Sequence, residues 1–188
     1  NTNELARGMQ AAIFDAHGEV IAQAEHIPMH LGSLLGVVRE ILARYPIEAL
    51  APGDVFIAND PYTGGGTHLP DINLVSPVFA GGALFGFVAN IAHHADRSAE
   101  KIRTIWDEGL RITPIRLVEA GRMREDVMEL LLANFALPHE RRGDFRQDPD
   151  RLLHGERAAA SPAAPVDEPL QGPAGQVVHR QEGSPAVL

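Results

Sequence analysis

The sequence predicts an α+β domain in which antiparallel β-hairpins build a sheet, wholly antiparallel or mixed, that packs against two to three helices. Three observations lead to this fold class. Apolar runs of strand length meet at glycine turns, two stretches repeat apolar residues at helical spacing, and the end of the chain is rich in Pro, Ala and Gly without a core pattern. A chain of 188 residues with 45% hydrophobic content is long enough to bury one core.

The first predicted elements are a hairpin and a helix. Met9–Asp15 and Val20–Ala24 are apolar runs, and Gly18 between them suits a turn position with positive φ. A helix is predicted over residues 31–45, where apolar side chains recur every three or four residues. Pro46 ends this helix because proline has no amide proton to donate.

The centre of the sheet is predicted from three apolar segments. Val55–Ala58 is a short strand that follows a turn-forming Pro-Gly-Asp sequence. Ile72–Phe79 and Leu84–Ala92 form an antiparallel hairpin around the glycine pair at 81–82. The second of these strands is apolar almost throughout, which indicates burial on both of its faces.

The last third of the chain is predicted to add a strand, a helix and a tail. Ile115–Val118 is a candidate strand, and residues 125–135 form a helix with acidic residues in its first turn. The tail has too little apolar surface to offset the entropy of ordering, so we expect it to be disordered. The chain thus divides into a polar amino-terminal end (1–8), a folded region (9–145) and a low-complexity tail (146–188).

Composition excludes several classes of partner and site. The 16 Lys and Arg residues against 25 Asp and Glu residues give a net charge of −9, so we expect no nucleic-acid and no membrane partner. The sequence has no cysteine, which excludes disulfides and thiolate metal sites. No apolar stretch approaches the length of a membrane span, and the polar start does not resemble a signal peptide. We expect a cytoplasmic protein, and a piece of a longer one because the first residue is not Met.

Two segments that contain His and Asp flank the central predicted hairpin. His68 and Asp71 form an H-x-x-D sequence before its first strand, and His93 and His94 end its second strand. Counted outward from the glycine turn, the two ends meet, which brings imidazole and carboxylate groups within reach of one ion. Such a set suits Zn²⁺, Mn²⁺ or Fe²⁺ and leaves coordination positions open for water or substrate. Neighbouring strand residues face opposite sides, so only one of the two adjacent histidines is expected to be a ligand.

The loop before this hairpin and a later turn supply further candidates. Asp60 is interpreted either as a base or supporting partner of the site or as the residue that closes an Asx turn. Tyr62 is a candidate hydrogen-bond donor. The glycines within Thr63–Thr67 indicate a tight turn that lets the backbone approach a site, with a phosphate cradle as the alternative. Arg111 is a candidate contact for an anionic substrate, or else one partner of an exposed salt bridge.

Several motifs, taken in order, resemble the hydantoinase B/oxoprolinase family. This family includes N-methylhydantoinase B-type subunits, the matching half of 5-oxoprolinase, and the alpha-type subunits of acetone and acetophenone carboxylases. The resemblance covers residues 9–145. It rests on QAEHIPMHLG (23–32), PGD (52–54), NDPY (59–62), GGTHLPD (65–71), AHHAD (92–96), EGLRI (108–112) and RGD (142–144).

The resemblance implies a divalent metal site and a partner subunit. The His-x-x-Asp and later His of the family correspond, by spacing, to His68, Asp71 and His94. Catalytic acid, base or supporting roles then fall to Asp60, Tyr62, His93 and Asp96. ATP is bound, and the substrate phosphorylated, by a hydantoinase A-type partner subunit and not by this chain.

From this resemblance we expect a fragment of the B-type subunit of an ATP-dependent, metal-assisted amidohydrolase that opens a cyclic amide such as a hydantoin or 5-oxoproline. One alternative is a subunit of an ATP-dependent ketone carboxylase, and another is a truncated remnant without catalytic activity. Two departures from the family pattern favour the remnant. Arg97–Lys101 replaces an expected glycine-rich segment, and the tail from residue 146 does not resemble the long further chain of the family.

Overall fold

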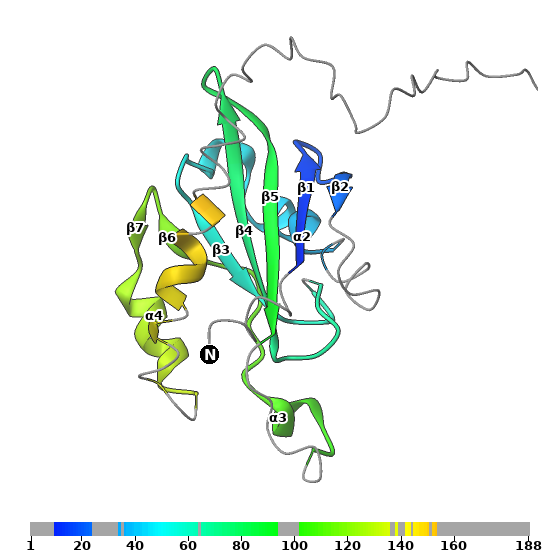
Figure 1. Ribbon diagram of the computed structural model, residues 1–188, viewed down its shortest axis with the longest axis vertical. Coiled ribbons are helices and arrows are strands. Elements are labelled where there is room, and N and C mark those ends of the chain that lie inside the picture. Colours follow the sequence, from blue (N-terminus) through cyan, green and yellow to red (C-terminus); the bar gives the residue numbers. More distant parts are fainter. Residues whose placement is uncertain are drawn as a thin grey trace, which may run out of the picture.

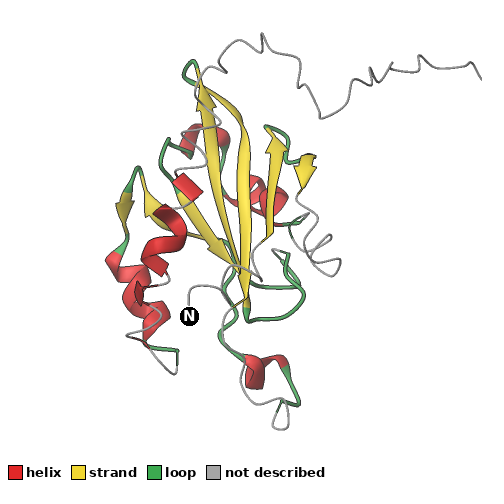
Figure 2. Ribbon diagram, in the orientation of Figure 1, coloured by secondary structure: helices red, strands yellow, loops and turns green. Residues whose placement is uncertain are grey.

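The computed structural model describes residues 10–23, 34, 36–63, 65–93, 102–135, 138, 142–143, 145–150 and 152–153. Within these ranges the chain forms a seven-stranded antiparallel sheet with helices on both faces (Figures 1 and 2), which confirms the predicted α+β class. The strands are β1 (Gln10–Asp15), β2 (Val20–Gln23), β3 (Val55–Ala58), β4 (Asp71–Ala80), β5 (Ala83–His93), β6 (Ile115–Glu119) and β7 (Arg122–Met123). Their spatial order is β2-β1-β5-β4-β3-β6-β7. The helices are α2 (Val37–Arg44), α3 (Ile105–Glu108), α4 (Glu125–Leu132) and a 3-10 turn at Ile47–Ala49.

The predicted central hairpin is formed by β4 and β5. Gly81 and Gly82 have φ angles of 59° and 84°, and two consecutive positive φ angles are typical of the tight turn that matches the twist of a hairpin. Both strands run slightly further than expected, so that β4 begins at Asp71 and β5 ends at His93. These two residues are direct cross-strand partners. The prediction that the two ends of the hairpin meet is therefore confirmed.

Side chains that alternate along the strands give the sheet two apolar faces, each covered by its own helices. Helix α2 covers one face because its buried residues, Val37, Val38 and Ile41, lie on one side of the helix. They pack against Phe14 of β1 and Phe87 of β5. The first face therefore holds β1 and β5 against the central strands.

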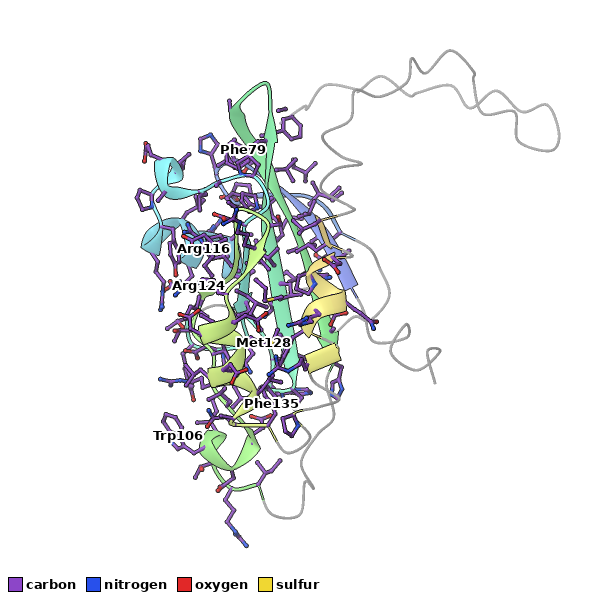
Figure 3. All side chains as sticks on the ribbon, turned by 90° about the vertical axis from the view of Figure 1, so that its left-hand side faces the viewer. Phe79, Trp106, Arg116, Arg124, Met128 and Phe135 are labelled. Carbon is purple, nitrogen blue, oxygen red and sulfur yellow. The ribbon has the colours of Figure 1, made fainter. Side chains whose placement is uncertain are left out.

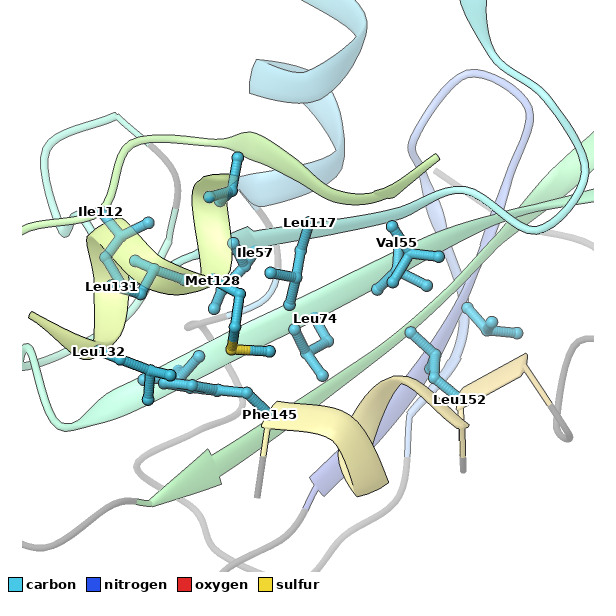
Figure 4. Packing of buried hydrophobic residues seen from close by; sticks show 14 of the residues in the cluster. Val55, Ile57, Leu74, Ile112, Leu117, Met128, Leu131, Leu132, Phe145 and Leu152 are labelled. Carbon is cyan, nitrogen blue, oxygen red and sulfur yellow. The ribbon is translucent and has the colours of Figure 1, made fainter. Parts of the chain in front are cut away.

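The second face is covered by α4 and by the helical residues 145–150 and 152–153. Met128 of α4 is fully buried against the sheet, and Phe145 and Leu152 belong to the same cluster (Figure 4). Burial of one such side chain contributes about 2 kcal/mol relative to its exposure. The predicted domain boundary at residue 145 thus falls within a helical segment that packs on the core.

Element ends differ from the sequence expectation in three further places. Helix α2 begins at Val37, not at residue 31, and residues 31–33 and 35 lie outside the described residues. Helix α4 ends at Leu132, three residues earlier than expected. The short helix α3 was not predicted, although Thr104 and Asp107 form a capping box at its start. Residues 154–188, predicted to be disordered, lie outside the described residues.

The helices give no sign of a membrane-spanning segment. In the part of the chain that the structure describes, none is long and apolar enough to cross a bilayer.

Candidate metal centre

Three side chains that bind metals in other proteins converge where β4 begins and β5 ends. His68, Asp71 and His93 each offer one nitrogen or oxygen atom, and these three atoms all lie within 4.8 Å of one another. The Nδ1 atom of His68 is 3.7 Å from Oδ2 of Asp71. The rings of His68 and His93 meet edge to face, with their centroids 5.1 Å apart.

Local backbone structure explains this convergence. The amide of Asp71 donates a hydrogen bond of 3.1 Å to the carbonyl of His68, so the H-x-x-D sequence forms a tight turn at the start of β4. The sheet register then places His93 directly opposite Asp71. One turn and one cross-strand pair are thus sufficient to bring the three side chains together.

Two polar groups of this cluster, the Asp71 carboxylate and Nδ1 of His68, are removed from water. Asp71 is 1% exposed, and its Oδ2 atom accepts a hydrogen bond of 2.9 Å from the Thr67 hydroxyl. The Nδ1 atom of His68 is buried and has no hydrogen-bond partner among the described residues. A buried nitrogen without a partner is costly, since it has lost its contacts with water. The lone pair of such a nitrogen is suited to coordinate a cation.

The geometry fits a divalent transition-metal ion. Ligand atoms about 2.0–2.2 Å from one ion lie no more than about 4.4 Å apart, so the group needs shifts of only a few tenths of an ångström. Two imidazoles and one carboxylate favour Zn²⁺, Mn²⁺ or Fe²⁺ over the all-oxygen sites of Ca²⁺. Three protein ligands also leave coordination positions open.

The structure brings His93 to the place where the sequence analysis expected a second imidazole. His93 had been given a catalytic or supporting role, and His94 the role of ligand. His94 and Asp96 lie outside the described residues. The observed group therefore consists of two predicted ligands and one residue predicted to act beside them.

The two candidates in the preceding loop have different environments. Asp60 is fully buried, and its oxygens accept hydrogen bonds of 3.0 Å from the Tyr62 amide and 2.7 Å from the Thr63 hydroxyl. These contacts form the Asx turn that was one of its two interpretations. The Tyr62 side chain is 75% exposed and extends from the same loop.

Asn59 fixes this loop to the rest of the site and was not identified from the sequence. Its Nδ2 atom donates hydrogen bonds to the carbonyls of Leu69 and Leu110, at 2.7 and 2.9 Å. Its Oδ1 atom accepts a hydrogen bond of 2.6 Å from the amide of Ile112. One buried amide therefore ties the His68–Asp71 turn to the segment that carries Arg111.

The glycine segment packs its backbone directly against these residues. Gly65 and Gly66 have φ angles of 72° and 118°, and a Cβ atom on Gly66 would lie 3.1 Å from the carbonyl oxygen of Asn59. This close approach is the tight-turn interpretation of the segment. Asn73 donates a hydrogen bond of 3.1 Å to the carbonyl of Gly65, and its Oδ1 atom is buried without a hydrogen-bond partner among the described residues. Asn73 was also missed, although its position two residues after Asp71 places it on the same strand face.

A hollow of about 460 Å³ lies between the loop after β3 and the segment around α3, and α3 projects away from the sheet (Figure 1). Its walls come from the loop after β3 and from the segment around α3, and they include Tyr62, Thr67, Arg103, Thr104 and Glu108. Thr67 lies in this wall and also donates its hydroxyl proton to Asp71. Thr67 therefore links the wall of the hollow to the candidate metal centre.

Comparison with protein families identifies one match that covers most of the chain. The model of the family described as hydantoinase B/oxoprolinase matches residues 4–160. The sequence is 38% identical to 5-oxoprolinase 1 of Arabidopsis thaliana over 128 residues, which cover 64% of this chain and 10% of that protein. It is 34% identical to caprolactamase subunit beta of Pseudomonas jessenii over 160 residues, which cover 81% of this chain and 27% of that subunit.

Solved structures also match the fold of this chain. The crystal structure of ATP-dependent caprolactamase from Pseudomonas jessenii matches with a TM-score of 0.68 and 30% identity, over 85% of this chain and 29% of that one. The nucleotide-free structure of acetone carboxylase matches with a TM-score of 0.60 and 19% identity, over 83% and 22%, and supports the fold alone. The chain thus spans between about a tenth and three tenths of the proteins it resembles.

Proposed function

The chain belongs to the hydantoinase B/oxoprolinase family, and we propose that it supplies the metal-binding part of the B-type half of an ATP-dependent enzyme that opens a cyclic amide. The convergence of His68, Asp71 and His93 on one point is the observation that carries this proposal. A divalent ion bound there supplies Lewis-acid polarisation of a carbonyl oxygen or a water molecule of lowered pKa.

The residues around the ligands have separate roles in this proposal. Thr67 holds the Asp71 carboxylate in its orientation, and Asn59 holds the His68–Asp71 turn in place. Asp60 supports the loop from which Tyr62 reaches the hollow. In this proposal His94 remains an alternative ligand to His93, which the His94→Ala variant below tests. Asp96 remains a candidate supporting residue.

A cyclic amide of the hydantoin or 5-oxoproline type is favoured over a ketone by the comparisons. The relatives named 5-oxoprolinase and caprolactamase are 30–38% identical to this chain. Acetone carboxylase, at 19% identity, supports the fold alone. In the complete enzyme, with ATP and a hydantoinase A-type partner subunit, we expect ring opening that does not require bicarbonate. Turnover that depends on bicarbonate would assign the chain to the carboxylase branch.

Metal titration of the purified chain tests the core of the proposal. We expect the wild type to bind one Mn²⁺ or Zn²⁺ ion by isothermal titration calorimetry. His68→Ala and His93→Ala should each abolish this binding, because each removes one of three protein ligands. His17→Ala is the matched control, since His17 lies exposed in the β1–β2 turn away from the site. Equal metal content in the wild type, His68→Ala and His93→Ala would overturn the proposal.

Two further measurements test whether His93 or His94 is the ligand, and whether the chain holds a functional site or is a remnant without one. His94→Ala should bind metal as well as the wild type if His93 is the ligand, and should lose binding if the assignment made by spacing holds. A functional site must also stabilise the fold by mass action, by about 2.7 kcal/mol at a metal concentration 100 times Kd. An unfolding midpoint that does not move at any metal concentration would indicate a remnant without a site.

A further inference from the structure

Arg111 lies in the segment that Asn59 ties to the His68–Asp71 turn, in an unusual setting for a surface arginine. Its Nε atom is 3.6 Å from Oδ2 of Asp60, a carboxylate that is fully buried. The centre of its guanidinium lies 5.1 Å from the centroid of the Trp106 ring. An indole at this distance attracts a cation and fixes the plane of the guanidinium. Asp60 thus pairs with the Arg111 side chain at Nε, and Trp106 covers one face of its guanidinium.

This arrangement leaves the outer edge of the guanidinium available. The Arg111 side chain is 34% exposed, and the described part of the chain places only Asp60 and Trp106 against its charged group. A guanidinium held at Nε presents its two terminal nitrogens as a fork. Two parallel N–H groups match the two oxygens of a carboxylate or phosphate group.

The surroundings connect this fork to the hollow and to the metal ligands. Asp60 holds the loop of Tyr62, which forms one wall of the hollow. Trp106 belongs to α3, whose residues Ile105 and Glu108 form the opposite wall. Arg111 therefore contacts one residue in each of the two segments that line the hollow. Figure 3 places Trp106 at the end of the molecule opposite Phe79, where the hairpin turns away from the site.

We propose that Arg111 and Trp106 form an oxyanion-recognition site that positions an anionic substrate in the hollow whose wall residue Thr67 donates a hydrogen bond to Asp71. The chemical class of the ligand is a planar ring or short chain that carries a carboxylate or phosphoryl group. The net charge of −9 makes general attraction of anions by this chain unfavourable, so anion binding requires a specific site of this kind. The inference rests on the proposed function, because it takes the metal ligands to be the groups that the bound molecule approaches.

Trp106 provides a direct measurement because it is the single tryptophan of the chain. The purified chain is titrated with 5-oxoproline, with the neutral 5-oxoproline amide, and with inorganic phosphate, while the fluorescence of Trp106 is recorded. We expect a saturable change with at least one anionic probe and none with the neutral amide. A response to 5-oxoproline assigns the site to a substrate carboxylate, and a response to phosphate alone assigns it to the phosphoryl group of an activated substrate.

Arg111→Lys tests the fork while the charge beside Asp60 is kept, so that the fold is preserved. Lysine is a point charge without a planar fork, and we expect the affinity for the anionic probe to fall at least tenfold. Arg39→Lys is the matched control, since Arg39 is an exposed arginine that pairs with Glu19 on the α2 side. Equal affinity in wild type and Arg111→Lys, or an equal response to the neutral amide, would overturn the inference.

The two proposals fail in different ways. Metal binding without any fluorescence response to the anions would overturn the inference about Arg111 and leave the metal centre in place. A response that requires Arg111, in a chain that binds no metal, would support the anion site and contradict the proposed function.

Discussion

Asp71 and His93 lie directly opposite each other on β4 and β5, and this single cross-strand pair creates the candidate metal centre. Directly paired residues in an antiparallel sheet have Cβ atoms about 4.5–5.5 Å apart, which allows the ligand atoms of their side chains to reach one ion. A slip of one residue would turn the His93 side chain to the other face of the sheet. The site therefore depends on the exact register of the hairpin.

The hydroxyl of Thr67 is expected to tune the affinity of this site. Thr67→Val removes the hydrogen bond of 2.9 Å to Oδ2 of Asp71 at almost unchanged volume. We expect the affinity for Mn²⁺ or Zn²⁺ to fall about 10–100-fold, the usual effect of losing a group that orients a metal ligand. Calorimetric titration measures this change. Thr63→Val, which loses a hydrogen bond to Asp60 instead, should bind metal like the wild type. Unchanged affinity in Thr67→Val would contradict this role.

Asn59→Leu is expected to destabilise the fold and the site together. The substitution leaves two carbonyl groups and one amide buried without partners, and each such group costs about 1–3 kcal/mol. The free energy of unfolding in urea should therefore fall by about 3 kcal/mol or more. Asn134→Leu is the control, because Asn134 is exposed and donates only to Leu130. A similar small loss in both variants would show that Asn59 does not hold the loop.

The sheet and helix α4 could be predicted from the sequence, whereas the helical residues 145–150 and 152–153 on the second face could not. The hairpin strands have an apolar pattern and glycine turns that are both local signals. The helical residues 145–150 contain Pro149 and lie next to a Pro- and Ala-rich tail, so local propensity argues against a helix. Burial of Phe145 and Leu152 on the sheet outweighs that propensity. This contact depends on the tertiary fold and has no local signature.

The sequence places imidazole and carboxylate groups at the meeting ends of the hairpin, and a β-bulge determines which residue lies opposite Asp71. A two-residue turn pairs Ala80 with Ala83, and continuing that register would place Ala92 opposite Asp71. The register shifts by one between Val78 and Phe79, which brings His93 to that position instead. A bulge of this kind is set by packing and twist and is not visible in residue spacing. Residue spacing alone could therefore not show that His93 lies opposite Asp71.

Arg116 and Asp54 form a buried ion pair that the sequence analysis did not identify. The Nε atom of Arg116 is 3.3 Å from Oδ2 of Asp54, which is fully buried. Arg116→Met leaves that carboxylate without its cation, and we expect a loss of about 3–5 kcal/mol in the free energy of unfolding. Urea denaturation of the wild type and variant measures it.

Arg124→Met serves as the comparison for this pair. Arg124 forms an ion pair of 2.7 Å with Asp126, but both side chains are exposed to solvent that screens the charges, so its loss should change stability far less. The contrast isolates the effect of burial. Equal losses in the two methionine variants would mean that Asp54 does not depend on Arg116.

Asp15 is expected to make the stability of the β1–β2 hairpin depend on pH. The backbone amides of Glu19 and His17 each donate a hydrogen bond of 2.9 Å to Oδ1 of Asp15. These bonds, that from Glu19 above all, lower the pKa of the Asp15 carboxyl below its usual value, although desolvation opposes them. A lowered pKa in the folded state means that the carboxylate stabilises the fold above the unfolded pKa of about 3.9. That stabilisation is lost as the pH falls through the folded pKa.

The comparison of wild type with Asp15→Asn tests this pH dependence. The neutral amide accepts the same backbone hydrogen bonds more weakly, because it does not carry the charge that strengthens them. We therefore expect the wild type to be more stable than the variant at neutral pH, and the difference to disappear at a pH below the folded pKa of Asp15. Urea denaturation midpoints of both proteins at the two pH values measure this difference in stability. An NMR titration of the Asp15 carboxyl measures its folded-state pKa. A stability difference that is the same at both pH values would show that the charge of Asp15 does not act through these amides.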